Sequence, residues 1–227
     1  MRVLVVAPHA DDETLGMGGT IAKLSSEGHQ VHVALMTGNG DNGAHPFLPS
    51  EGFDEVRDEF DAALKALGVS KKIVCNLPAV LVESLPTHEV NEITKNVLEQ
   101  VKPDRLYLPF AYDLHRDHRE LFYSFMVHCR SYLKLGRSIS EVYCYETPSE
   151  THLSAPYLEA SFTPNCYVDI SEQLGAKLAA LGCYKSQAQE APLPRSPVAI
   201  EALARYRGSQ IGAEAAEAFV LVRKIQN

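Results

Sequence analysis

The sequence predicts an α/β fold built on a mostly parallel sheet. Apolar runs of strand length alternate with segments of helical periodicity, which is typical of parallel strands joined by right-handed crossovers. Polar clusters follow two of these runs, at the position where open α/β sheets place their ligands. The chain has 227 residues, of which 45% are hydrophobic, so we expect one domain over residues 1–227 with a sizeable core.

The elements of the first half follow from apolar patterns and turn residues. Buried strands are predicted at residues 2–7, 30–37, 72–77 and 105–110. Helices are predicted from the glycine-rich segment 16–19 to about Gly28, over 53–67, and within 86–101. Gly16, Gly18 and Gly19 lack the G-x-G-x-x-G spacing of a nucleotide site, and no acid ends the second strand. We therefore assign these glycines to helix packing and disfavour a nucleotide-dependent enzyme.

The second half continues the alternation less regularly. We expect a helix at 117–133, a strand at 141–146, a long loop over 147–165, a helix at 171–184 and a closing strand at 219–224. Ser171 is the predicted N-cap of the second of these helices, because its hydroxyl group is suited to accept a bond from a backbone N–H. The proline-rich segment 192–197 is expected to lead over the surface to a further short helix.

Charge and cysteine content narrow the class of protein. The formal net charge is −8 and no stretch is rich in lysine or arginine, so nucleic acid is not an expected partner. No apolar stretch is long enough to span a membrane, and we expect no membrane association. The five cysteines are scattered without a C-x-x-C pair, which indicates reduced thiols and a cytoplasmic location.

Two pairs of metal-ligating residue types follow predicted strands. His9 and Asp12 are three residues apart after the first strand, and His115 and His118 have the same spacing after the strand at 105–110. A catalytic zinc ion takes about three protein ligands and keeps one position open. We expect His9, Asp12 and His118 to hold Zn²⁺, and a mixed histidine and carboxylate set also accepts other divalent metals.

The remaining polar residues of the two clusters suit acid–base chemistry. Asp11 adjoins a ligand and is the predicted general base, while His115, as an imidazolium, is predicted to stabilise an oxyanion or protonate a leaving amine. Asp117 is predicted to orient either His115 or a ligand. The alternative is that Asp11 or Asp12 merely caps the helix that follows. The chain has no G-x-S-x-G sequence, so a serine hydrolase has little support.

With these residues in place, the chain resembles the LmbE/PIG-L family of zinc-dependent N-deacetylases. The segment Ala7-Pro8-His9-Ala10-Asp11-Asp12-Glu13 is similar to the family's A-H-P-D-D-E motif, and His115-Arg116-Asp117-His118 is similar to its H-P-D-H motif. Weaker similarities lie at Arg57-Asp58-Glu59, at Tyr184-Lys185-Ser186-Gln187 and from Arg207 to Phe219. The resemblance implies a Rossmann-like three-layer sandwich whose metal site lies at the carboxyl ends of the strands.

The resemblance also implies roles for individual residues. His9, Asp12 and His118 match the zinc ligands, Asp11 the general base and His115 the histidine that stabilises the oxyanion. Arg57 matches an arginine that contacts sugar hydroxyls, with an ion pair to Asp61 as the alternative. Glu13 and Tyr112 are further candidates for substrate contact, and packing is the alternative for Tyr112.

The function implied is zinc-dependent hydrolysis of the N-acetyl group of an amino sugar. The substrate class is a GlcNAc-type glycoside, conjugate or nucleotide sugar, and the products are acetate and a free amine. Two alternatives stay open: the same metal centre cleaving a larger amide conjugate, and a non-catalytic sugar-binding protein. A homo-oligomer is also expected, because the apolar strand near the C-terminus looks uncapped and because members of the family assemble.

Overall fold

The computed structural model describes residues 1–40, 45–69 and 71–226, and its strands form one mixed sheet. Within these residues the strand order is β3-β2-β1-β4-β5-β7-β6. The strands are β1 (Arg2–Ala7), β2 (Gln30–Gly38), β3 (Lys71–Pro78), β4 (Arg105–Pro109), β5 (Glu141–Tyr145), β6 (Cys166–Asp169) and β7 (Ala216–Lys224). The first five run parallel, and β7 is antiparallel to both β5 and β6. The predicted parallel sheet is confirmed, with one antiparallel strand added.

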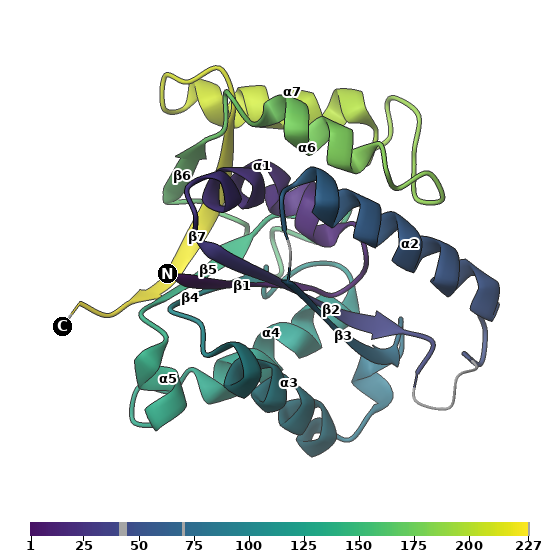
Figure 1. The fold of residues 1–227 in the computed structure, drawn as a ribbon, viewed down its shortest axis with the longest axis vertical. Helices are drawn as coiled ribbons and strands as arrows, with labels where there is room; N and C mark the ends of the chain where they lie inside the picture. The colour runs from purple at the N-terminus through teal and green to yellow at the C-terminus, as the bar shows by residue number, and fades with distance from the viewer. Residues whose placement is uncertain (41–44, 70, 227) are drawn as a thin grey trace.

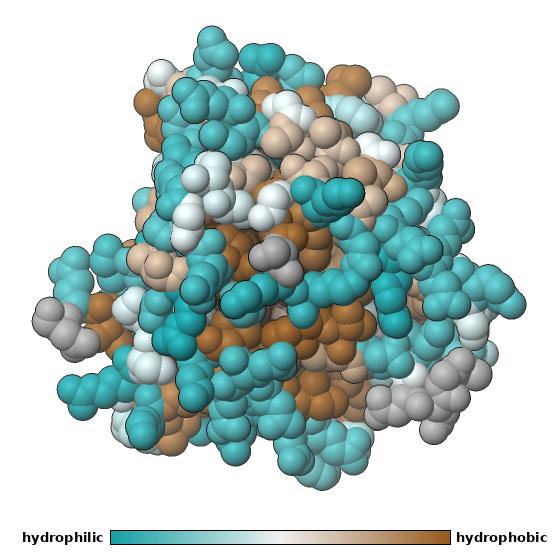
Figure 2. Space-filling view, viewed as in Figure 1, coloured by the Kyte–Doolittle hydropathy of each residue, from teal (hydrophilic) through white to brown (hydrophobic). Residues whose placement is uncertain are grey.

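Helices cover both faces of the sheet and make three layers (Figure 1). On one side lie α1 (Asp12–Ser26) and α2 (Ser50–Ala66), and α6 (Leu174–Leu181) and α7 (Pro197–Ser209) lie on the same side, farther from the central strands. The other holds α3 (Thr87–Val101), α4 (Arg116–His128) and the short α5 (Lys134–Ser138), and a 3₁₀ turn at Val82–Ser84 precedes α3. In the view of Figure 2, hydrophobic residues gather at the centre of the face between more polar surroundings.

The central strand β1 shows why a continuous apolar run forms here. Its side chains alternate between the two faces, and both faces are covered by helices. Val3 and Val5 belong to the core on the side of α1 and α2, whereas Leu4 and Val6 belong to the core on the side of α3 and α4. All four are fully buried, as expected for a parallel strand between two helical layers.

The glycines near the start of α1 have the packing role predicted for them. A Cβ atom at Gly16 would collide with the Tyr145 ring, and one at Gly19 would lie 2.6 Å from the Ile170 side chain. The helix begins earlier than predicted, at Asp12, and it bends at Met17, whose backbone is not helical. The glycines therefore lie inside the helix, where they let it approach β5 and the residue after β6.

The second half differs from the prediction at several boundaries. The helix predicted at 117–133 ends at His128, and α5 forms separately. The helix predicted at 171–184 spans only Leu174–Leu181, and Ser171 is not its N-cap. The Ser171 hydroxyl instead donates to Asp169 Oδ1 at 2.6 Å. Strand β6 lies just after the predicted loop and was not expected, because its four residues carry too short a pattern to recognise.

The position of β7 corrects one expectation about assembly. This strand begins at Ala216 and lies between β5 and β6, with pairing partners on both sides. It is therefore not an uncapped edge, and the argument for a homo-oligomer that rested on an exposed apolar strand is wrong. Among the described helices, none is both long and apolar enough to cross a membrane.

Candidate metal and catalytic site

The two polar clusters meet because β1 and β4 are neighbouring parallel strands. Val3, Leu4 and Val5 of β1 pair in register with residues 105–107 of β4. The segments that leave the carboxyl ends of these strands consequently lie side by side, although about a hundred residues separate them. The rings of His9 and His115 have centroids 4.4 Å apart. In Figure 1, β2 points toward the same side of the molecule, where α2 begins.

His9, Asp12 and His118 present three ligand atoms to one point. Asp12 Oδ2 lies 3.3 Å from His9 Nδ1 and 3.2 Å from His118 Nε2. One ligand atom from each residue lies within 4.8 Å of the others, a spacing suited to a metal ion. The backbone N–H of His9 also donates to Asp12 Oδ2 at 2.8 Å, which holds the carboxylate in this position.

The hydrogen bonding of His118 fits a metal ligand. Its ring is fully buried, and Nδ1 lies 2.8 Å from Asp113 Oδ2. Nε2, on the other side of the ring, is buried and has no hydrogen-bond partner among the described residues. A buried polar atom without a partner is costly, and a carboxylate behind a histidine is the usual support of a metal-ligating ring.

A second candidate group consists of His9, His115 and Asp117, but its carboxylate is already engaged. Asp117 Oδ2 lies 2.9 Å from His9 Nε2 and accepts the Val80 N–H at 2.7 Å, while Oδ1 accepts the Val82 N–H at 3.1 Å. Asp117 is therefore placed to orient His9, which is one of the two alternatives that the sequence left open. The first group fits a metal better, because the buried His118 Nε2 makes no hydrogen bond within the described residues and faces only a fellow candidate ligand, Asp12 Oδ2.

Asp113 is a site residue that the sequence reasoning missed. It is fully buried, and besides the His118 contact its Oδ1 accepts a bond from the Thr151 hydroxyl at 2.6 Å. Burial raises the pKa of Asp113, against the opposing influence of the His118 contact. The available signal was its place shortly after the strand at 105–110, just before the second motif.

Asp11 sits on a strained backbone beside the metal-ligand cluster. Its φ angle is 122°, which L-residues rarely adopt, and its side chain makes no capping bond to α1. The simple capping alternative therefore fails for Asp11. Its Oδ2 instead accepts a bond from Arg195 Nη1 at 3.1 Å, a contact that the sequence did not reveal. Burial, with Asp12 as the next cause, raises the pKa of Asp11 to about 8, and Arg195 opposes this rise.

The pKa values of neighbouring groups in the cluster depend on both burial and nearby charges. Burial alone would raise the pKa of Asp12, but His118 and His9 together hold it well below its usual range. Burial, followed by the charge of His9, lowers the pKa of His115 to about 4. The Nδ1 atom of His115 accepts the Asp117 N–H at 3.1 Å, which leaves Nε2 to carry the proton of a neutral ring. The sequence had suggested an imidazolium here.

A cavity of about 440 Å³ opens beside the cluster. It reaches from Asp11, Asp12 and His115 to the α2 side, where Phe53, Val56 and Arg57 line it. The Arg57 side chain is directed to Asn76, whose Oδ1 lies 3.4 Å from Nη2. The alternative partner Asp61 pairs with Lys72 instead.

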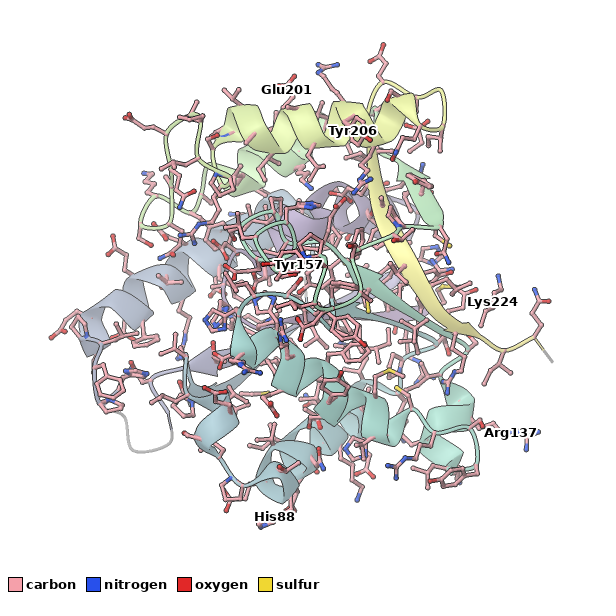
Figure 3. The ribbon with its side chains drawn as sticks, turned by 180° about the vertical axis from the view of Figure 1, so that it is seen from behind. His88, Arg137, Tyr157, Glu201, Tyr206 and Lys224 are labelled. Atoms are coloured by element: carbon pink, nitrogen blue, oxygen red, sulfur yellow. The ribbon has the colours of Figure 1, made fainter. Side chains whose placement is uncertain are left out.

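Two other predicted substrate contacts lie outside this cavity lining. Glu13 is fully buried, and its Oε1 accepts bonds from the hydroxyls of Thr14 and Tyr184, both at 2.6 Å. Tyr112 packs against Phe110, with ring centroids 5.6 Å apart. The structure therefore gives Glu13 and Tyr112 packing and hydrogen-bonding positions. Figure 3 shows the crowded interior from behind, with Tyr157 of the 147–165 loop near the centre of the view.

The chain matches known proteins over most of its length. A family model described as PIG-L, GlcNAc-PI de-N-acetylase, matches residues 4–128. The uncharacterized deacetylase YaiS of Escherichia coli is 29% identical over 189 residues, covering 81% of this chain and 90% of that protein. The diacetylchitobiose deacetylase of Thermococcus kodakarensis is 27% identical over 227 residues, covering 95% and 81%.

Solved structures agree on the fold. The N,N'-diacetylchitobiose deacetylase of Pyrococcus horikoshii superposes with a TM-score of 0.73 at 25% identity, covering 97% of this chain and 83% of that one. The 4-carboxy-2-hydroxymuconate hydratase GalB of Pseudomonas putida does so with a TM-score of 0.75 at 20% identity, covering 100% and 99%. A hydratase on this fold means that the reaction must be argued from the site.

Fold and site together define an α/β protein with a candidate metal centre at the carboxyl ends of its central strands. The match over residues 4–128 spans more than half of the chain, and the protein belongs to the PIG-L/LmbE family.

Proposed function

We propose that the protein is a metal-dependent N-deacetylase that hydrolyses the acetamide of an amino sugar. The observation that carries the proposal is the convergence of His9, Asp12 and His118 next to Asp11, with the buried His118 Nε2 left without a hydrogen-bond partner among the described residues. The relatives named as deacetylases support it, because this site lies within the matched segment.

His9, Asp12 and His118 would hold the metal ion, and Zn²⁺ suits this nitrogen and oxygen donor set. When bound, such an ion polarises a carbonyl group and lowers the pKa of water. Asp117 and Asp113 keep the two histidine rings in place through contacts of 2.9 Å and 2.8 Å. These carboxylates fix which ring nitrogen faces the metal position.

The reaction then needs a base, an oxyanion donor and an acid. Asp11 takes a proton from the attacking water as the water oxygen bonds to the acetamide carbon. The Nε2–H of His115 donates a hydrogen bond to the carbonyl oxygen, which becomes negatively charged. When the C–N bond breaks, Asp11 returns its proton to the nitrogen, and acetate and a free amine result.

The cavity supports a sugar-sized substrate. Its volume of about 440 Å³ exceeds what an acetyl group fills, so the rest of the substrate occupies the space toward α2. Arg57 offers hydrogen-bond donors to sugar hydroxyls there, while Phe53 and Val56 offer an apolar surface to a sugar face. The same volume keeps the larger-amide alternative open, whereas the base Asp11 argues against a pure binding protein.

The test is acetate release from N-acetyl amino sugars, diacetylchitobiose, GlcNAc conjugates and nucleotide sugars, with zinc added or chelated. We expect zinc-dependent acetate from at least one class of these substrates. Asp58→Asn, an acid-to-amide change on α2 outside the cavity lining, is the matched control for Asp11→Asn. Release of a bulkier acid from larger amides, with no acetate, would favour the alternative amidase. Sugar binding without any hydrolysis would favour the binding protein.

A further inference from the structure

Asp11 has fewer side-chain partners than its neighbours, although it is buried among like charges. Asp11, Asp12 and Glu13 are consecutive carboxylates with 4%, 3% and 0% exposure. Asp12 faces two histidines and Glu13 faces two hydroxyl groups. Within the described residues, the Asp11 side chain has one hydrogen-bond partner, the guanidinium of Arg195. Arg195 reaches it from the loop before α7, across a sequence separation of 184 residues.

We propose that Arg195 is a positioning residue for the general base, a role that rests on the proposed function. Arg195 Nη1 binds Oδ2 of Asp11 at 3.1 Å, and no hydrogen bond to Oδ1 is found within the described residues. One carboxylate oxygen is thus held, while the other is left to accept a proton. The side chain of Arg195 selects the oxygen of Asp11 that works as the base.

Arg195 is itself fixed from several directions. Its backbone N–H donates to Gln189 Oε1 at 3.0 Å, and Nη1 lies 3.4 Å from Gln187 Oε1. The next residue, Ser196, is buried and caps α7 by accepting the Ala199 N–H at 3.3 Å. The guanidinium itself contacts Gln187 and Asp11, while its buried Nε has no hydrogen-bond partner among the described residues. The anchored backbone and the Gln187 contact therefore restrict where Nη1 can lie.

The hydrogen bond between Arg195 and Asp11 also lies between two neighbouring cavities. Asp11, Gln187 and Arg195 line both the main cavity and a second one of about 170 Å³. The Arg195–Asp11 pair is therefore part of the wall between them. If Arg195 is shortened, Asp11 loses its partner and gains room to turn toward the second cavity, so its alignment with the acetamide is lost.

The test compares Arg195→Ala and Arg195→Lys with Arg205→Ala. Arg205 is a matched control, since it pairs with Glu201 on the exposed side of α7, and Glu201 points away from the molecule in Figure 3. We expect Arg195→Ala to lower kcat about 100-fold with KM changed less than about 3-fold, because misaligned catalytic groups cost rates of this size. Arg195→Lys and added guanidinium ion should each restore part of kcat, and Arg205→Ala should match the wild type.

A second readout does not depend on activity. Crystal structures of the wild type and of Arg195→Ala should show the Asp11 carboxylate turned away from its original orientation in the variant. The proposal is overturned if Asp11 keeps its orientation, or if Arg195→Ala raises KM and leaves kcat unchanged. If the wild type releases no acetate from any substrate, the proposed function fails, while the orientation of Asp11 in the two crystal structures still decides the role of Arg195.

Discussion

Two buried clusters of charge lie on either side of the first half of α1, and they differ in how completely they are paired. Behind the helix, Lys177 Nζ donates to Glu217 Oε1 at 2.6 Å and to the Leu15 carbonyl at 2.9 Å. Glu217 accepts the backbone N–H groups of Gly19 and Thr20 at 3.0 and 2.6 Å. These bonds satisfy the backbone groups that the bend at Met17 leaves free.

The cluster at the end of β1 is incomplete by comparison. His118 Nε2 makes no hydrogen bond within the described residues and lies 3.2 Å from Asp12 Oδ2, and the side chain of Asp11, on a strained backbone, has one hydrogen-bond partner there. Buried polar groups are normally satisfied, and His118 Nε2 lies together with ligand atoms of His9 and Asp12, so a metal ion would complete this cluster. The complete cluster stabilises the fold, and the incomplete cluster carries the proposed chemistry.

The largest effect is expected at the incomplete cluster. Asp11→Asn should lower kcat by about 10²–10⁴-fold, because an amide cannot accept the proton and general-base catalysis contributes factors of this size. Steady-state acetate release measures the change, and metal content should stay equal to that of the wild type. A variant that keeps nearly full kcat would show that Asp11 is not the base.

Breaking the complete cluster should affect stability instead. Lys177→Met leaves Glu217 buried without its cation, at a cost of about 3–5 kcal/mol in the free energy of unfolding. Urea denaturation measures this cost. The matched control is Lys95→Met, which removes an exposed ion pair with Glu99 and should cost no more than about 1 kcal/mol. Equal losses in both variants would contradict the structural role of Lys177.

Asp113 combines a structural and a functional role, because it contacts the candidate metal ligand His118 without contacting the metal position itself. Asp113→Asn should weaken metal affinity by about 10–100-fold, since a carboxylate behind a ligating histidine raises its basicity. Competition with a chromophoric chelator measures the affinity. An unchanged affinity would mean that the His118 contact only fills space.

The smallest effect concerns a third paired group, Glu146. Burial would raise its pKa, but His152 and Arg207 outweigh burial and hold it below the usual 4.5. The stability that ionised Glu146 gains from His152 and Arg207 is therefore present above pH 4.5. It is lost as the pH falls through the lower, folded-state pKa of Glu146. Urea denaturation from about pH 7 to pH 3 should show the advantage of the wild type over Glu146→Gln shrinking with acid. A constant difference would refute this linkage.

Recognition from sequence succeeded where the signal was local. β1 was predicted with its observed bounds, and the buried run explains why, since no other element type suits it. His9, Asp12 and His118 were chosen from short spacings after strands, and the structure brings them together. Prediction failed where a contact crosses the chain, as for Asp113 with Thr151 and for Arg195 with Asp11.

The sequence by itself determined the alternation of strands and helices, the family motifs and the residue types able to hold a metal, because these depend on neighbours within a few positions. Only the tertiary structure decided that β7 lies inside the sheet, that Glu13 and Tyr112 lie outside the cavity lining, and that Arg195 reaches Asp11. Those outcomes depend on packing between distant segments, and the pairing of buried charges is specified by that packing rather than by any local pattern.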